Sequence, residues 1–363
     1  MEPSPQPPPP DPADRRGGGR IGTHILAIFG LVTASVAQPI FDLLAREATF
    51  LVAHGFGRRE VLGLVALLVV AVPAIVAAPG VLLLGLRPKL GEAYFGAVAG
   101  LLAVPMALAA ARRLPAAEGV PPAAWLALAA AVALGVAALY VRRGEARLFA
   151  AVLAVGVLVA PIWFLGQPSL RRLMTADVDP GAHDGADVQT PVVMIVFDEL
   201  PLASLMDGDG NLLEKRFPSF ARLARTSHWL RNATTVSDHT HYALPAIVTG
   251  RYPSFGQLPA YWDHPRSLFT LLGSSHRIHA VEVVSRLCPP TLCSDPGNGQ
   301  DGGQNGGGDP GTGWGALLAD LGVLYLRFTW PAALADAAGV PDVTSAWRGF
   351  GEGAQTRHDL FHA

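Results

Sequence analysis

Residues 61–86 read VLGLVALLVVAVPAIVAAPGVLLLGL, and none of these positions carries a charged side chain. A helix of about 20 apolar residues is long enough to cross the hydrocarbon core of a bilayer. A helix on the surface of a soluble protein would instead show a polar face, and this segment has none. The stretch therefore predicts a membrane-spanning helix rather than a buried helix of a soluble core.

Four further apolar stretches of similar length accompany this segment, at 22–45, 93–111, 122–141 and 148–166. Short connectors rich in arginine separate them. The first stretch has the weakest signal, because Gln38, Pro39 and Asp42 lie near its end. The sequence predicts a transmembrane domain of about five helices over residues 21–167.

Half of the 363 residues are hydrophobic and only 15% are charged, compared with about 25% charged residues in a typical soluble protein. No aspartate occurs between Asp42 and Asp177, so acidic residues concentrate in the second half. We therefore expect the lipid bilayer to surround the first half and water the second. The net charge of −2 gives no support to nucleic-acid binding.

Three segments have the composition of unstructured chain. Residues 1–20 are rich in proline and glycine, which predicts a disordered tail. Residues 168–190 are interpreted as a linker, and residues 294–313 as a flexible glycine-rich loop. An odd number of spans places the two chain ends on opposite sides of the membrane. The basic residues divide almost equally between the two sets of connectors, so they do not decide the orientation.

The hydrophobic pattern changes at residue 191. The segment PVVMIVFDE (191–199) is an apolar run that ends in two acids, which is typical of a buried parallel strand. Further strands are expected at 228–236 and 276–284, and helices at 217–226, 243–250 and 267–275. This alternation predicts an α/β domain over residues 191–363.

Asp198 and Glu199 are the first candidate site residues. Acids at the carboxyl end of a strand face the crevice where α/β proteins bind ligands, and carboxylates suit a divalent cation. The alternative is an acid pair that caps the next turn. Thr240 is the second candidate, because its hydroxyl would face the positive end of the helix that follows, where anions bind. The alternative for Thr240 is a helix N-cap.

Three segments together resemble the start of a sulfatase-type domain of the alkaline-phosphatase superfamily. They are PVVMIVFDE, RFPSFARLA (216–224), and the stretch from Thr240 to AIVTGRYP (246–253). The resemblance implies that Thr240 holds the nucleophile position and that Asp198 and Glu199 bind a divalent metal ion (Ca²⁺, Mg²⁺, Mn²⁺ or Zn²⁺). It also implies phosphate or sulfate esters of envelope lipids or polymers as substrates. Similar membrane-anchored families, such as lipoteichoic acid synthases and phosphoethanolamine transferases, use a threonine nucleophile and carry the catalytic domain outside the cell membrane.

The sequence departs from that family in two places. Position 240 is neither cysteine nor serine, so formylglycine chemistry is not expected, and a threonine alkoxide fits phosphoryl transfer instead. No Asp-His-Gly motif follows Gly250, so the chain is expected to hold only the first part of such a domain. The alternative function is a catalytically incomplete membrane protein that lacks the C-terminal metal ligands.

Cys288 and Cys293 are the only cysteines in the chain. A zinc site would need further cysteine or histidine ligands nearby, so we favour a disulfide. Disulfides persist in oxidising compartments. The pair therefore predicts that the C-terminal domain lies outside the cytoplasm, which agrees with the odd number of spans. Together the spans and the pair predict a multi-pass protein of the cell membrane with an extracytoplasmic C-terminal domain.

Overall fold

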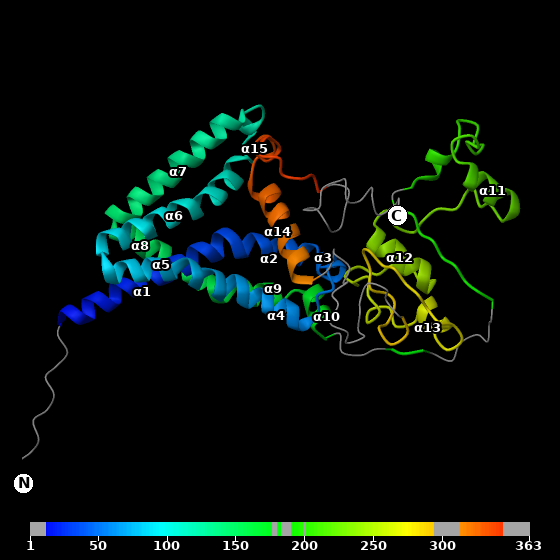
Figure 1. Ribbon diagram of the computed structural model, residues 1–363, viewed down its shortest axis with the longest axis horizontal. Coiled ribbons are helices and arrows are strands. Elements are labelled where there is room, and N and C mark those ends of the chain that lie inside the picture. The colour runs from blue at the N-terminus through cyan, green and yellow to red at the C-terminus, as the bar shows by residue number, and fades with distance from the viewer. Residues whose placement is uncertain (1–11, 176–179, 183–189, 199, 294–312, 344–363) are drawn as a thin grey trace, which may run out of the picture. The chain divides into compact units, whose positions relative to one another are not determined.

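The computed structural model describes residues 12–175, 180–182, 190–198, 200–293 and 313–343 (Figure 1). The chain divides into two compact units. One unit combines Met1–Asp177 with Gly297–Ala363, and the other is Val178–Pro296. We call them the membrane unit and the insert unit, because the second interrupts the first in the sequence.

The membrane unit contains, within the described residues, five helices long and apolar enough to cross a bilayer. They are Ile21–Arg46, Arg58–Leu86, Pro88–Ala111, Pro122–Arg142 and Gly144–Leu165. The prediction of about five membrane-spanning helices is thus confirmed in length and composition. At most 33% of the apolar window is buried inside the protein in the second to fifth helices. Their exposed apolar surface is what lipid would cover.

Each span is a single helix or a stack of shorter ones that continue one another. The first span comprises the part of α1 (Pro12–Val32) from Ile21 onward, η1 (Thr33–Ala37) and α2 (Gln38–Arg46). The second consists of α4 (Arg58–Ala66), η2 (Leu67–Ala71) and α5 (Val72–Leu86). The third is α6 (Pro88–Ala111) and the fourth α7 (Pro122–Arg142). The fifth consists of α8 (Gly144–Val152), η4 (Leu153–Val155) and α9 (Gly156–Leu165). The turns η1 and η2 are π-helical.

Small residues let α6 and α7 approach each other closely. Gly96 and Gly100 lie four positions apart on α6 and face Ala137 and Ala133 of α7. A side chain added at Gly100 would overlap the backbone carbonyl of Ala133. This spacing of glycines is a common contact motif between helices in membranes, where packing rather than hydrophobicity drives association.

One pair of buried polar side chains links the spans of the membrane unit. His24 in α1 lies with its Nδ1 2.9 Å from the hydroxyl of Tyr140 in α7. The His24 ring also stacks on Phe95 of α6, with ring centroids 4.8 Å apart. This contact links three spans at one end of the bundle and satisfies a polar group that would be costly to leave alone in hydrocarbon.

The helices α14 (Gly313–Thr329) and α15 (Ala332–Ala337) belong to the membrane unit (Figure 1, orange to red). The structure therefore differs from the prediction of one domain over 191–363. Asp320 of α14 lies 3.0 Å from the Nε2 of His54, which follows α3 (Thr49–Ala53), and both side chains are buried.

Further hydrogen bonds fasten α14 to the spans. The Tyr325 hydroxyl donates to the carbonyl of Ser35 at 2.9 Å, within the π-helical turn η1. The Arg112 guanidinium, at the end of the third span, donates to the carbonyls of Arg327 (2.9 Å) and Trp330 (3.1 Å). These bonds replace water for backbone groups at the end of α14.

Two segments predicted as unstructured contain helix. Residues Pro168–Thr175, in the predicted linker, form α10, with Leu170 and Leu173 buried. The amphipathic spacing of these leucines explains why the segment packs instead of extending. Helix α1 begins at Pro12, inside the predicted tail. Residues 1–11 and nearly all of the predicted loop 294–313 lie outside the described residues.

The insert unit has short helices joined by extended chain. It contains η5 (Leu202–Leu205), α11 (Pro218–Thr226), α12 (Thr240–Thr249) and α13 (Leu268–Leu272). The helices predicted at 217–226, 243–250 and 267–275 are thus confirmed, although α12 begins three residues earlier and α13 is shorter than predicted.

The predicted strands at 191–199, 228–236 and 276–284 are wrong for the described residues, which form only isolated β-bridges. The side chains of Val193 and Ile195 are 83% and 70% exposed. A parallel strand needs a hydrogen-bonded neighbour and covering helices. Within the described residues this run has no neighbouring strand, and its ring contact with a helix is that of Phe197 with Phe220 of α11, with centroids 5.8 Å apart. The predicted α/β sulfatase-like fold is therefore not supported, and only its helices are found.

Candidate functional site

Two of the three predicted site residues lie in direct contact. The Thr240 hydroxyl donates a hydrogen bond to Oδ1 of Asp198 at 2.8 Å, although the two residues are 42 positions apart in the sequence. Asp198 is exposed and Thr240 is half-buried. Contact over this separation requires the chain to bring the end of the apolar run to the start of α12. The third predicted residue, Glu199, lies outside the described residues.

Thr240 is the first residue of α12, and His239 holds the N-cap position. The N-cap makes no side-chain hydrogen bond to the helix, and the Thr240 hydroxyl turns to Asp198 instead. The alternative interpretation of Thr240 as the cap is therefore wrong. The helix ends at Gly250, whose φ of 65° lies in the left-handed region that glycine adopts without strain.

Aromatic rings surround the start of α12. The rings of His239 and His241 stack with centroids 5.4 Å apart, and Tyr242 lies 4.2 Å from His241. Burial lowers the pKa of His241 below its ordinary value, and the nearby His239 lowers it further. His241 is therefore mostly neutral at neutral pH and adds little charge beside the Thr240 hydroxyl.

The donor atoms near Asp198 and Thr240 bear on the predicted metal site. Within the described residues, no three His, Cys, Asp or Glu side chains lie close enough together to hold a metal ion. Asp198 and Thr240 together offer oxygen donors, the kind that hard divalent cations accept. Such cations take six or more oxygen ligands, so these two residues fit only part of a site.

A cavity of about 250 Å³ adjoins the start of α12 and runs along this helix. Its charged and aromatic lining comes from both ends of α12 and from a following loop: His241, Tyr242, Arg251, Asp263, His264 and Arg266. The sequence interpretation missed this cavity. Its signal was the basic pair Arg251 and Arg266 in a short stretch after the candidate nucleophile, and the sequence interpretation gave neither arginine a role.

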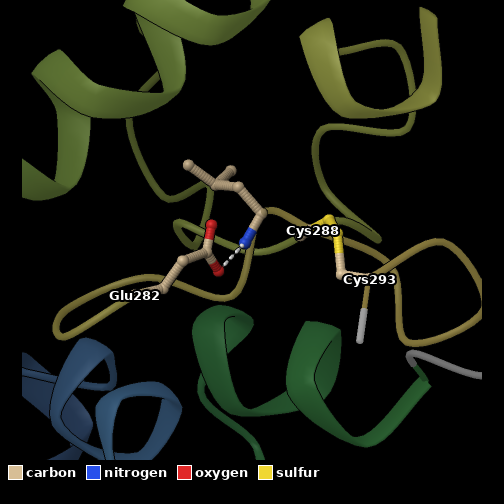
Figure 2. Close-up of a disulfide and its surroundings, with 4 residues drawn as sticks. Glu282, Cys288 and Cys293 are labelled. Carbon is tan, nitrogen blue, oxygen red and sulfur yellow. Dashed lines mark hydrogen bonds between the residues drawn. A yellow bond between two sulfur atoms is a disulfide. The ribbon is translucent and has the colours of Figure 1, made fainter. Parts of the chain in front are cut away.

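A disulfide joins Cys288 and Cys293 in the same unit, as predicted (Figure 2). The segment before it is held by Glu282, whose carboxylate accepts the backbone N–H of Leu287 at 2.7 Å. Leu287 is fully buried, so the disulfide follows a core residue. The loop is further closed by the Cys293 N–H, which donates to the Pro289 carbonyl at 3.1 Å.

Comparison with known proteins returns no relative. No protein family, curated protein or solved structure matches this chain. The resemblance to sulfatase-type domains therefore stays a prediction that rests on the residues themselves.

Proposed function

We propose that this chain is an integral membrane hydrolase or transferase that acts on phosphate or sulfate esters, with Thr240 as its nucleophile. The observation that supports the proposal most is the 2.8 Å hydrogen bond from Thr240 to Asp198. A hydroxyl nucleophile is weak until a neighbouring base or cation takes up its proton or charge. In this proposal the base is Asp198, which accepts the hydrogen bond from the Thr240 hydroxyl.

The chemical step follows from this pair. The Thr240 oxygen attacks the phosphorus or sulfur atom of the ester and forms a new bond to it, while its proton passes to Asp198. The bond to the leaving oxygen breaks, and that oxygen keeps the electron pair and takes a proton from water. Water or an acceptor hydroxyl then attacks the phosphorus or sulfur atom and gives up a proton to the solvent. The bond from that atom to the Thr240 oxygen breaks, and this oxygen takes back the proton held by Asp198, which completes hydrolysis or transfer.

A divalent cation is the second part of the proposal. Ca²⁺, Mg²⁺, Mn²⁺ or Zn²⁺ bound at Asp198, with Glu199 as a further ligand, would neutralise the ester oxygens. Asp198 and Thr240 supply only part of a ligand set and do not determine which ion binds. The chemical step given above therefore does not depend on a cation. Adding a chelator distinguishes the two proposed roles of Asp198, as cation ligand and as general base. Loss of ester turnover would support the bound cation, whereas retained turnover would support Asp198 as the base alone.

The proposed location is the outer side of the cell membrane. Five spans would place the insert unit opposite the N-terminus if all five cross the bilayer. The disulfide between Cys288 and Cys293 is stable in an oxidising compartment. Substrates there include lipid headgroups and envelope polymers that carry phosphate or sulfate esters, and the proposal takes these as its substrate class.

The experiment compares turnover of aryl phosphate and aryl sulfate esters by the full-length protein in detergent, with each cation in turn. Thr240→Ala should abolish turnover and Asp198→Asn should reduce it at least about a hundredfold, the lower range for general-base catalysis. Thr235→Ala is the matched control, because Thr235 is an exposed threonine in the same segment. Equal turnover by the parent protein and Thr240→Ala would exclude Thr240 as the nucleophile.

The alternative is a membrane protein without catalysis, and one observation favours it. All six side chains of Val192–Phe197 are at least 43% exposed, whereas this run would be the buried central strand of a complete sulfatase-like domain. Absence of turnover toward every ester and cation, from protein with an intact melting transition, would support this alternative.

A further inference from the structure

The cavity beside α12 begins next to the candidate nucleophile. His241 and Tyr242, in the first turn of the helix, line it together with Thr249 at the last turn and Arg251 just beyond. The ten residues of α12 span about 15 Å at 1.5 Å per residue. The cavity therefore extends along the helix, away from Thr240.

The charged groups of the cavity are mainly cationic. Arg251 and Arg266 contribute two guanidinium groups, and Asp263 contributes one carboxylate. That carboxylate already accepts the backbone N–H of Leu258 at 2.7 Å. Burial lowers the pKa of His264, so it adds little charge at neutral pH. The remaining positive charge favours an anion.

Both guanidinium groups are available to a ligand. Within the described residues, neither the Arg251 nor the Arg266 side chain makes a hydrogen bond or ion pair, and both residues are exposed. A guanidinium group binds phosphate, sulfate or carboxylate through two parallel hydrogen bonds. Two such groups on one small cavity are therefore suited to a tetrahedral anion.

Aromatic side chains and the size of the cavity limit the ligand further. Tyr252, which also lines the cavity, is 86% exposed. Phe255, whose ring contacts Tyr242 at 5.8 Å, is 93% exposed. Tyr252 and Phe255 therefore offer exposed aromatic contact area at and near the cavity. A volume of about 250 Å³ admits one small anionic unit rather than a polymer segment.

We propose that this cavity is a second anion site, which holds a phosphate or sulfate group of the substrate at a distance from the ester that Thr240 attacks. The substrate is then a lipid headgroup or polymer that carries at least two anionic groups. The link to turnover rests on the proposed function, whereas anion binding by Arg251 and Arg266 does not.

Calorimetric titration of the full-length protein in detergent with inorganic phosphate and with inorganic sulfate tests the site directly. Arg251→Gln/Arg266→Gln should weaken the binding of at least one anion by about tenfold or more. Arg251→Lys/Arg266→Lys, which keeps the charge, should retain more of the affinity. The matched control is Arg222→Gln/Arg277→Gln, which removes two exposed arginines of the same unit, and it should leave the affinity unchanged.

Anion binding and ester turnover, measured on the same variants, distinguish this site from the proposed catalysis. Thr240→Ala should bind phosphate like the parent protein, even if its turnover is lost. Phosphate and sulfate binding with the same affinity in Arg251→Gln/Arg266→Gln, at an unchanged melting temperature, would overturn the second anion site and leave the role of Thr240 untouched. Loss of anion binding in that variant, without any ester turnover in the parent protein, would support the site and contradict the proposed function.

Discussion

The membrane unit and the insert unit are built from different kinds of contact. The spans are long helices that pair small residues and bury polar side chains as partners, as His24 does with Tyr140. The insert unit has short helices, isolated β-bridges and an exposed apolar run at Val192–Phe197. The backbone of the membrane unit is hydrogen-bonded within its long helices, whereas the insert unit leaves the apolar side chains of Val192–Phe197 largely exposed. Helices therefore form within one segment, and a strand needs a neighbouring strand.

The largest expected effect is on the buried pair that fastens α14 within the membrane unit. Asp320→Ala would leave His54 without its charged partner, and the loss of one member of a buried pair costs about 3–5 kcal/mol. Thermal unfolding of the full-length protein in detergent measures the change. Asp336→Ala is the control, because its pair with Arg327 is 64% exposed on the Asp336 side, and such surface pairs contribute about 1 kcal/mol or less. Equal effects of the two variants would contradict the buried pairing.

The second effect concerns the close contact between α6 and α7. Gly100→Val should destabilise the membrane unit by about 1–3 kcal/mol, the usual cost of overpacking, because the added side chain meets the backbone of α7. Gly135→Val is the matched control, since nothing lies within 4 Å of a side chain added there. The melting temperatures of the two variants are compared in detergent. An equal loss of melting temperature in Gly135→Val would contradict close packing of α6 on α7 at Gly100.

The third effect concerns the disulfide of the insert unit. Cys288→Ser/Cys293→Ser opens a loop with a sequence separation of 5, and the chain-entropy relation gives a loss of about 2 kcal/mol for so short a loop. Limited proteolysis should then cut the insert unit faster and leave the spans at their former rate. Faster cutting in the spans as well would mean that the two units are not independent.

The smallest effect is a dependence of the insert unit on pH. Burial lowers the pKa of both His241 and His264, so the unfolded chain binds protons before the folded one does as the pH falls. The unit is therefore most stable above the ordinary histidine pKa of about 6.5 and loses stability below it. Hydrogen exchange of α12, measured from pH 7.5 downward and corrected for the intrinsic exchange rate, should show lower protection at acid pH. His241→Gln/His264→Gln should flatten this dependence, and an unchanged slope would assign it to other groups.

The sequence predicted what depends on local pattern and missed what depends on distant partners. The spans and α11 were found because a helix satisfies its backbone within one segment. The run at 191–199 has the composition of a strand, but a strand forms only beside another one. The return of α14 to the membrane unit was missed for a similar reason. Two residues could have indicated it: Asp320, an acid in an apolar helix, and His54, a histidine between two spans. The sequence alone does not show that these two residues pair with each other.

The candidate site was predicted in part. Asp198 follows an apolar run and Thr240 precedes a predicted helix, which made both residues predictable, and they lie in hydrogen-bond contact. The cavity with Arg251 and Arg266 could not be predicted, because it depends on how the chain folds back along α12. The roles of Asp198 and Glu199 toward a metal ion stay predictions.

The most direct measurement of the central claim is the detection of a covalent intermediate on Thr240. Full-length protein incubated with a phosphate ester and a divalent cation is quenched in acid, and the peptide 232–251 is weighed by mass spectrometry. The account predicts one added phosphoryl group on Thr240, present in Thr235→Ala and absent in Thr240→Ala. Ester turnover by the parent protein without any such adduct, or with the adduct at another residue, would contradict it.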